Sequence, residues 1–238
     1  MIKKKEIIVA PSILSGDFGK LADEAKRVEQ AGADNLHLDV MDGHFVPNLT
    51  MGPQAVAAIN RATNLFLDVH LMIYNPFEYV ESFVEAGADR ITFHFEATED
   101  VEEVLEYIRK CNVQAGLAFC PETSAEFVPS YLTKCDLILL MTVHPGFGGQ
   151  SFMPEVLDKI RYVRETCDQH NIRAGGKIAS REKKEDLPIF NIQVDGGIND
   201  TTAHQCIQAG ANVLVAGTYL FKEIEMAEGI KKLRACGE

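Results

Sequence analysis

The sequence predicts an α/β protein with a single (β/α)8 barrel, the TIM-barrel architecture, over residues 1–238. Short apolar runs alternate with longer helical patterns along the chain, which is typical of parallel strands joined by helical crossovers. Eight strand–helix pairs fill a chain of about the length that this barrel requires. Three segments, QAGADNLHL, EAGADRITF and QAGANVLVA, each end a helix with Ala-Gly-Ala and enter a strand. An open doubly wound sheet is less favoured, because no GxGxxG follows the first strand.

The predicted strands are short runs of apolar and β-branched residues. A barrel wall is covered on both faces, so such runs need not alternate with polar residues. The strands are Ile7–Ser12, Asn35–Met41, Phe66–Met72, Arg90–Phe95, Val113–Phe119, Asp136–Val143, Ile189–Asp195 and Val213–Ala216.

The predicted helices fill the intervals between the strands. Gly32 and Gly87 end the first and third helices, and Pro53 stands in the first turn of the second. The helices are Gly19–Ala31, Pro53–Arg61, Pro76–Ala86, Asp100–Lys110, Ala125–Leu132, Met153–His170, Asp200–Ala209 and Ile224–Arg234. The charged segment 174–187 interrupts the alternation, and we expect it to be a surface insertion at the amino-terminal face of the barrel, remote from chemistry.

Composition and charge exclude several classes of protein. The chain is 46% hydrophobic and 24% charged, as in ordinary globular domains. Its 23 Lys and Arg against 35 Asp and Glu give a net charge of −12, which argues against a nucleic-acid binder. No apolar run approaches the ~18 residues of a membrane span. Six scattered cysteines without a CxxC pair indicate reduced thiols, so we expect a cytoplasmic protein that binds neither nucleic acid nor membrane.

Polar side chains gather at the carboxyl ends of four predicted strands, where the active groups of such barrels lie. Residues two apart on a strand share a face. The polar set comprises Ser12, His37, Asp39, Asp68, His70 and Asp195. A lone His in a strand is usually a hydrogen-bonded core residue, but several buried carboxylates are costly unless they bind something.

The sequence therefore predicts a metal or catalytic site, and its nitrogen and oxygen ligands suit zinc, iron(II), manganese or cobalt. We expect Asp68, one layer deeper than His70, to support the site from behind. We expect His94 to form part of the pocket wall.

Glycines follow three strands at the same end of the barrel. They lie in the segment His144–Gln150, at Gly196 and Gly197, and at Gly217 before Thr218. Glycine lets backbone amides approach an anion, and loops after the seventh and eighth strands form the usual phosphate site of this barrel, completed by a helix N-terminus. Three methionines beside the strand ends, which we expect to cover the pocket and keep it dry, are Met41, Met72 and Met141.

The chain resembles the ribulose-phosphate 3-epimerase family over almost its whole length. The matching motifs are APSILSGDF (10–18), HLDVMDGHFVPNLTMGP (37–53), DVHLMI (68–73), HPGFGGQSF (144–152), VDGGI (194–198) and AGTYLF (216–221). The resemblance implies a metal-dependent isomerase of the pentose phosphate pathway that interconverts D-ribulose 5-phosphate and D-xylulose 5-phosphate. It implies self-association as well, without fixing the number of subunits.

The resemblance also assigns roles to residues of this chain. The acid/base pair is Asp39 and Asp195. The ligands of one divalent metal ion are His37, Asp39, His70 and Asp195. The substrate contacts are Ser12, His70, Gly146, Phe147, Gly148, Gly149, Asp195, Gly196, Gly197, Gly217 and Thr218. The chain departs from the family at His144, which is usually Asn, and at Thr218, which is commonly Ser and keeps the hydroxyl.

Three other functions compete with this interpretation. An epimerase of a six-carbon ketose phosphate, such as D-allulose 6-phosphate, would share all four ligands, and the pocket at 142–152 would distinguish it. A phosphate-binding decarboxylase or aldolase would want a Lys near the carboxylates, and 35–45 and 66–72 contain none. A non-catalytic barrel would have lost one or more of the site carboxylates, all of which are present.

Overall fold

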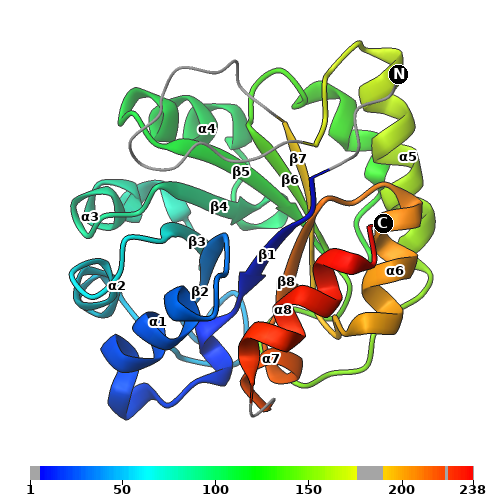
Figure 1. Cartoon of the computed structure of the whole chain (residues 1–238). Helices are drawn as coiled ribbons and strands as arrows, with labels where there is room; N and C mark the ends of the chain where they lie inside the picture. The colour runs from blue at the N-terminus through cyan, green and yellow to red at the C-terminus, as the bar shows by residue number, and fades with distance from the viewer. Residues whose placement is uncertain (1–5, 176–189, 223–224, 238) are drawn as a thin grey trace.

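A computed structural model describes residues 6–175, 190–222 and 225–237. Its eight strands form one parallel sheet in the order β1-β8-β7-β6-β5-β4-β3-β2. A parallel bridge between Ser12 and His37 joins the two ends of this order. The predicted (β/α)8 barrel is therefore confirmed, with the strands at the centre and the helices outside (Figure 1).

The strands agree with the predicted ranges to within two residues at each end. Strands β2, β3 and β8 agree at both ends. The strands are β1 (Ile8–Pro11), β2 (Asn35–Met41), β3 (Phe66–Met72), β4 (Arg90–His94), β5 (Gln114–Phe119), β6 (Leu137–Met141), β7 (Asn191–Asp195) and β8 (Val213–Ala216).

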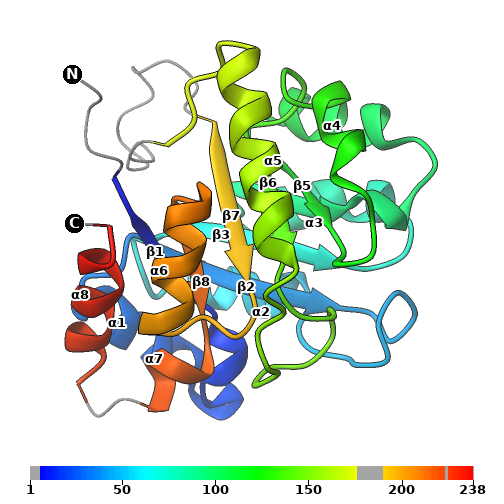
Figure 2. The same cartoon turned by 90° about the vertical axis from the view of Figure 1, so that its right-hand side faces the viewer.

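The helices form the outer layer of the barrel. The α-helices are α1 (Leu21–Gln30), α2 (Pro53–Asn60), α3 (Val80–Glu85), α4 (Val101–Lys110), α5 (Val156–Gln169), α6 (Asp200–Ala209), α7 (Thr218–Lys222) and α8 (Met226–Ala235). The 3-10 helices are η1 (Ile13–Ser15), η2 (Phe18–Lys20), η3 (Pro76–Tyr79), η4 (Phe95–Ala97) and η5 (Ala125–Ser130). Helices α5 and α6 pack side by side outside β7 (Figure 2).

Helix α4 shows why these segments pack on the barrel wall. Its buried residues, Val101, Val104, Leu105 and Ile108, recur at the spacing of one helical face. They join the continuous core between helices and strands.

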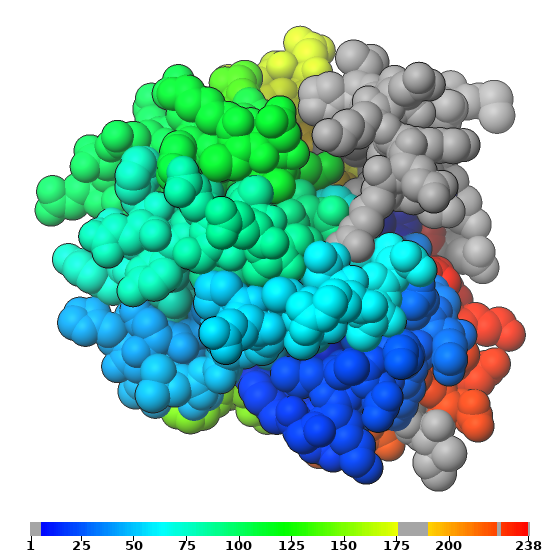
Figure 3. Space-filling model, turned by 90° about the vertical axis from the view of Figure 1, so that its left-hand side faces the viewer, coloured from blue at the N-terminus to red at the C-terminus, as the bar shows by residue number. Residues whose placement is uncertain are grey.

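On the side shown in Figure 3, successive segments of the chain cover the surface in sequence order, from α1 to the region of α4.

A repeated hydrogen bond fixes the amino-terminal end of the barrel. One side chain before each even-numbered strand accepts the backbone N–H near the start of the preceding strand. The pairs are Asp34 with Val9, Asp89 with Leu67, Asp136 with Ala115 and Asn212 with Ile192, at 2.8–2.9 Å. Three of these acceptors are the residues that follow Ala-Gly-Ala in the repeated segments. The repeat therefore ends a helix and also aligns two strands.

Two predicted helices differ in kind, and one α-helix was not predicted. The predicted helix Ala125–Leu132 is the 3-10 helix η5, which contains Pro129, a residue without the N–H that an α-helix interior needs. The start of the predicted helix Pro76–Ala86 is also 3-10. Helix α7 was missed because its five residues are too few to show a helical period.

Most of the predicted insertion, residues 176–187 of 174–187, lies outside the described residues. Its surface position stays a prediction. In the described part of the chain, we find no helix with the length and apolar character that a membrane span requires.

Candidate active site

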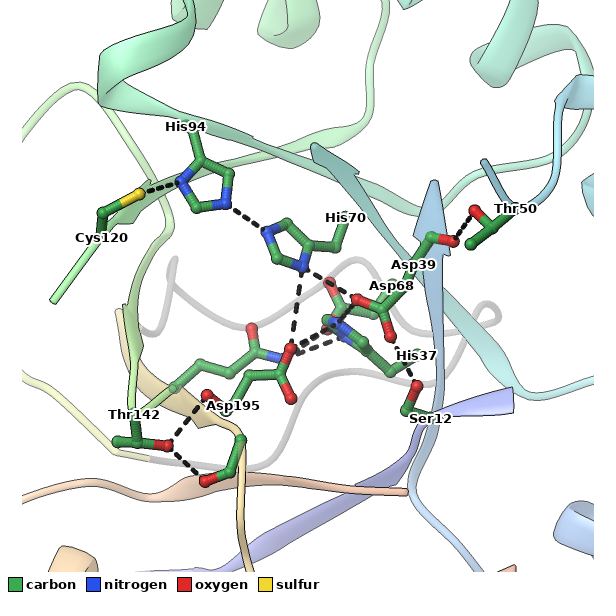
Figure 4. Close-up of polar contacts among 12 residues, drawn as sticks. Ser12, His37, Asp39, Thr50, Asp68, His70, His94, Cys120, Thr142 and Asp195 are labelled. Atoms are coloured by element: carbon green, nitrogen blue, oxygen red, sulfur yellow. Dashed lines mark hydrogen bonds and ion pairs between the residues drawn. The ribbon is translucent and has the colours of Figure 1, made fainter. Parts of the chain in front are cut away.

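Four side chains from three strands converge inside the carboxyl end of the barrel. They are His37 and Asp39 of β2, His70 of β3 and Asp195 of β7 (Figure 4). The register sets His37 opposite Asp68 and Asp39 opposite His70. One ligand atom from each of the four lies within 4.8 Å of the others. We call these four residues the four-residue cluster.

The distances within the four-residue cluster centre on its two carboxylates. Asp39 Oδ1 lies 3.3 Å from His37 Nε2 and 3.1 Å from His70 Nδ1. Asp195 Oδ2 lies 3.6 Å from His37 Nε2 and 3.8 Å from His70 Nδ1. Both carboxylates therefore point inward and reach the same pair of imidazoles.

The surroundings move the pKa values of the two carboxyl groups in opposite directions. Burial raises the pKa of Asp39, but the charges and hydrogen bonds of His37 and His70 outweigh burial and hold it well below its usual range. For Asp195, burial and the negative charge of Asp39 raise the pKa to about 7. Opposite shifts of this kind are how two carboxyl groups in one site come to differ as acid and base.

The two imidazoles also differ. Burial lowers the pKa of His37, but Asp39 and Asp68 outweigh it and raise the value well above the ordinary one. For His70, burial dominates and lowers the pKa to about 4. Because His37 lies between two carboxylates, their negative charges favour its protonated form.

The four-residue cluster fits a divalent cation. His37 Nε2 is buried and has no hydrogen-bond partner among the described residues, although it faces both Asp39 and Asp195. Ligand atoms at about 2.0–2.2 Å from one ion lie about 3.0–3.5 Å apart, close to the distances found here. Two nitrogens and two carboxylate oxygens are ligands for zinc, iron(II), manganese or cobalt, so the predicted metal site has suitable chemistry and spacing.

A fully paired carboxylate lies directly below the four-residue cluster. Asp68 is completely buried and contacts His37 Nδ1 at 2.9 Å, Arg90 Nε at 2.9 Å and Gln193 Nε2 at 2.7 Å. Burial raises the pKa of Asp68, but the charges of Arg90 and His37 outweigh it and lower the pKa far below the usual range. The predicted support by Asp68 from behind agrees with this geometry, since an ionised Asp68 orients the His37 ring.

Hydroxyl groups hold the two carboxylate-bearing strand ends. Ser12 Oγ donates to Asp39 Oδ2 at 2.6 Å, and Thr50 Oγ1 donates to the Asp39 carbonyl at 2.7 Å. Thr142 Oγ1 lies 2.9 Å and 2.6 Å from the carbonyl oxygens of Asp195 and Gly196. Asp39 is therefore positioned through its side chain and its backbone, and Asp195 through its backbone.

A cavity of about 460 Å³ opens from the four-residue cluster toward the glycine-containing loops. The predicted site residues on its wall are Ser12, Asp39, Met41, Met72, Met141, Gly146, Phe147, Gly148, Gly149, Asp195, Gly196, Gly197, Gly217 and Thr218. His37 and His70 are fully buried behind this wall. The structure thus gathers almost all of the predicted substrate contacts around one cavity, with His70 behind Asp39.

The loops around the cavity come close to one another, and glycine makes this possible at two positions. A Cβ at Gly217 would lie 2.5 Å from Ser15 Oγ, and one at Gly197 would lie 2.7 Å from the backbone nitrogen of Phe152. No Lys or Arg of the described chain lines the cavity. An anion bound there would meet hydroxyls and backbone amides rather than cationic side chains.

Polar contacts also fix the β6–α5 loop over the cavity. Asn48 Nδ2 donates to the Gly146 carbonyl at 2.7 Å, and Gln150 Nε2 donates to the carbonyls of His144 and Phe147. The exposed His144 side chain contacts Glu122, with Nδ1 2.8 Å from Oε1. His144 also lines the cavity, so this departure from the family lies on the cavity wall and outside the four-residue cluster.

The prediction for His94 was wrong. His94 is fully buried and is absent from the cavity wall, because its ring turns toward His70 (Figure 4). Sequence analysis also missed Arg90 and Gln193. The available signal was the two-residue period, which places Arg90 on the face of His94 and Gln193 on the face of Asp195.

Comparisons of the sequence with known proteins agree on one family. The sequence model of the Ribulose-phosphate 3 epimerase family matches residues 8–221. A ribulose-phosphate 3-epimerase of Chlamydia pneumoniae is 53% identical over 238 residues, which cover 100% of this chain and 98% of the relative. One from Bacillus subtilis is 44% identical and covers 96% of this chain and 98% of the relative.

Solved structures with low sequence identity share the fold. A 3-hexulose-6-phosphate synthase superposes with a TM-score of 0.65 at 16% identity, covering 97% of this chain and 99% of that structure. A tryptophan synthase α-subunit from Pyrococcus furiosus gives a TM-score of 0.68 at 14% identity, with the same coverage of both chains. At this identity the likeness bears on the barrel alone.

Proposed function

The chain belongs to the ribulose-phosphate 3-epimerase family and is an isomerase, and we propose that it interconverts D-ribulose 5-phosphate and D-xylulose 5-phosphate in the pentose phosphate pathway. The observation that carries this proposal is the convergence of Asp39 and Asp195 on one cluster at the wall of one cavity. Relatives at 44–53% identity over nearly the whole chain carry the name of this activity.

Epimerisation at carbon 3 requires two groups that act on opposite faces of the substrate. The hydrogen at carbon 3 is acidic because the neighbouring ketone stabilises the resulting enediolate. One group must remove this proton, and a second must return a proton to the other face. Asp39 on β2 and Asp195 on β7 are three strands apart around the barrel, so a substrate in the cavity can lie between them.

We assign Asp39 as the base and Asp195 as the acid in the D-ribulose to D-xylulose direction, with the roles exchanged in reverse. The Ser12 hydroxyl donates to Asp39 and so favours the ionised carboxylate that a base requires. Asp195 lies nearer the open cavity, with 15% of its side chain exposed against 5% for Asp39.

The residues proposed to hold a divalent metal ion are His37, Asp39, His70 and Asp195. Such an ion would act as a Lewis acid and stabilise negative charge on the substrate oxygens. Met41, Met72 and Met141 border the same cavity and would limit the access of water to it, which strengthens charge interactions inside.

The phosphate group is assigned to the loops after β6, β7 and β8. These loops supply Gly146–Gly149, Gly196–Gly197 and Gly217–Thr218 to the cavity wall. Backbone amides exposed at glycines, together with the Thr218 hydroxyl, are typical ligands of a phosphate in this fold.

The decisive experiment assays D-ribulose 5-phosphate and D-allulose 6-phosphate with metal-stripped and remetallated protein. The proposal expects turnover of the pentose phosphate that falls on stripping and returns with zinc, iron(II), manganese or cobalt. In deuterium oxide, the product should carry deuterium at carbon 3. Preference for the six-carbon substrate, or unchanged activity after verified metal removal, would contradict the proposal.

Three further features are proposed on more general grounds. All six cysteines are free thiols, which suits a reducing compartment such as the cytoplasm. We also propose that the enzyme acts on its small sugar phosphate as a homo-oligomer and binds neither nucleic acid nor membrane. Light scattering at several concentrations measures the state of association directly.

A further inference from the structure

We propose that His94 and Glu96 are positioning residues that hold the His70 ring in the tautomer whose Nδ1 lone pair faces the four-residue cluster. This inference rests on the cation proposed above for the cluster. It assigns a role to side chains that lie behind the cavity and do not line it.

The two nitrogens of His70 face different partners. Nδ1 lies 3.1 Å from Asp39 Oδ1, inside the four-residue cluster. Nε2 lies 3.0 Å from His94 Nε2, outside it (Figure 4). Both rings are completely buried and stack with their centroids 5.0 Å apart, so water cannot easily replace either contact.

The position of the proton on each ring determines which nitrogen donates and which accepts in these contacts. A neutral imidazole that binds a cation through Nδ1 carries its proton on Nε2. His70 Nε2 must then donate, and His94 Nε2 must accept. The proton of a neutral His94 consequently sits on Nδ1, so the His70 tautomer depends on whether the surroundings of His94 Nδ1 accept a hydrogen bond.

Glu96 provides that acceptor. Its Oε2 lies 3.3 Å from His94 Nδ1, and the Cys120 sulfur lies 3.4 Å from the same nitrogen. The other oxygen, Oε1, accepts the Cys120 backbone N–H at 2.9 Å and the Thr123 hydroxyl. Burial raises the pKa of Glu96, but contacts led by His94 outweigh it and lower the pKa to about 2. An ionised carboxylate can only accept, which favours the proton on His94 Nδ1.

The same side chains could instead bind a second cation. Ligand atoms of His94, Glu96 and Cys120 lie within 4.8 Å of one another. Binding there would require a lone pair on His94 Nδ1 and a proton on Nε2. That proton would face His70 Nε2 and require a lone pair on it, which moves the His70 proton to Nδ1 and removes a ligand from the four-residue cluster. With neutral rings at 3.0 Å, the two sites exclude each other.

The test replaces the acceptor without changing its size. Glu96→Gln places an amide where the carboxylate stood, so an NH₂ group competes to face His94 Nδ1. The matched control is Glu126→Gln, an exposed glutamate in η5 on the following segment. His94→Gln keeps an acceptor for His70 Nε2, whereas His94→Leu removes it. Zinc affinity is measured by chelator competition on intact folded protein, and imidazole tautomers by ¹⁵N NMR of the zinc-loaded protein.

The proposal expects Glu96→Gln and His94→Leu to bind zinc about 10–100-fold more weakly, with His94→Gln closer to wild type and Glu126→Gln unchanged. Wild-type spectra should show the His94 proton on Nδ1. If wild-type protein binds no zinc, the cation of the proposed function falls and this inference with it. If wild type binds zinc and Glu96→Gln binds it equally well, this inference alone is overturned. A second bound equivalent, with a thiolate-to-metal band in cobalt-loaded protein, would also overturn it.

Discussion

Aspartates at the two ends of the barrel have different roles. At the amino-terminal end, Asp34, Asp89 and Asp136 each accept a backbone N–H from a neighbouring strand. At the carboxyl end, Asp39 and Asp195 face two imidazoles and each other's charge. A carboxylate satisfied by backbone stabilises the fold, whereas carboxylates crowded together remain available to bind a cation or move a proton.

Between these two ends, the buried pair of Arg90 and Asp68 contributes both to the fold and to the site. Arg90 is fully buried and balances the charge of Asp68, which in turn orients His37. The Arg90 guanidinium lies 5.1 Å from the centre of the Phe66 ring. Its Nη1 and Nη2 atoms have no hydrogen-bond partner among the described residues. The pair therefore supports the four-residue cluster through a fixed cation, in contrast to the exchangeable cation proposed above it.

The largest effect should come from neutralising a carboxylate at the carboxyl end. Asp39→Asn and Asp195→Asn should each lower kcat by at least about 10⁴-fold, the upper range for loss of a general acid or base. The free energy of unfolding should change little for Asp195→Asn, because the raised pKa of Asp195 means that its charge does not stabilise the fold. Asp39→Asn should lower it, because the ionised Asp39 carboxylate is stabilised by His37, His70 and the Ser12 hydroxyl. Epimerase kinetics and urea unfolding measure the two quantities. Near-normal turnover in either variant would remove that residue from the acid/base pair.

Disrupting the Asp68–Arg90 pair should mainly lower the free energy of unfolding. Arg90→Met leaves Asp68 buried without its cation and should lower the free energy of unfolding by about 3–5 kcal/mol. Asp68→Leu combined with Arg90→Met removes both charges, and it should recover part of this loss while zinc binding stays weak. Urea unfolding of the single and double variants measures the difference. A loss below about 1 kcal/mol for Arg90→Met would indicate that other groups compensate Asp68.

The smallest effect should come from one carboxylate at the amino-terminal end. Asp34→Ala leaves the Val9 N–H without its acceptor and also removes the ion pair with Arg234. It should cost about 1–3 kcal/mol of stability, with kcat unchanged. Asp34→Asn should cost less, because Asn212 already fills the equivalent position. Thermal or urea unfolding beside steady-state kinetics tests the contrast. A drop in kcat for Asp34→Ala at a temperature where it is folded would mean that the two ends are coupled.

Local sequence was enough to predict the barrel and the four-residue cluster. Strands β2 and β3 are apolar runs of seven residues with polar side chains only on alternate positions. The two-residue period therefore placed His37, Asp39 and His70 on the inner face before any contact was known. The glycines after β6, β7 and β8 likewise indicated an anion site, because few other residues let backbone amides approach a ligand so closely.

Contacts between distant strands could not be predicted in the same way. A charged residue at the start of a strand, such as Arg90, ordinarily lies in solvent, and only the barrel brings it to Asp68. Whether His94 faces the cavity or His70 depends on ring rotation, which strand spacing does not determine. The repeated Ala-Gly-Ala segments were visible, but the hydrogen bond of the next Asp or Asn depends on the adjacent strand.

The alignment of β2 with β3 has a consequence for folding as well as for chemistry. A slip of two residues would keep every side chain on its own face, so apolar patterning alone does not prevent it. In one direction such a slip would set Asp39 against Asp68, and in the other His37 against His70. The observed alignment is the one in which each acid meets a base. The side chains of the proposed active site thus also favour the correct alignment of β2 with β3, and variants that neutralise them should misalign more often during refolding.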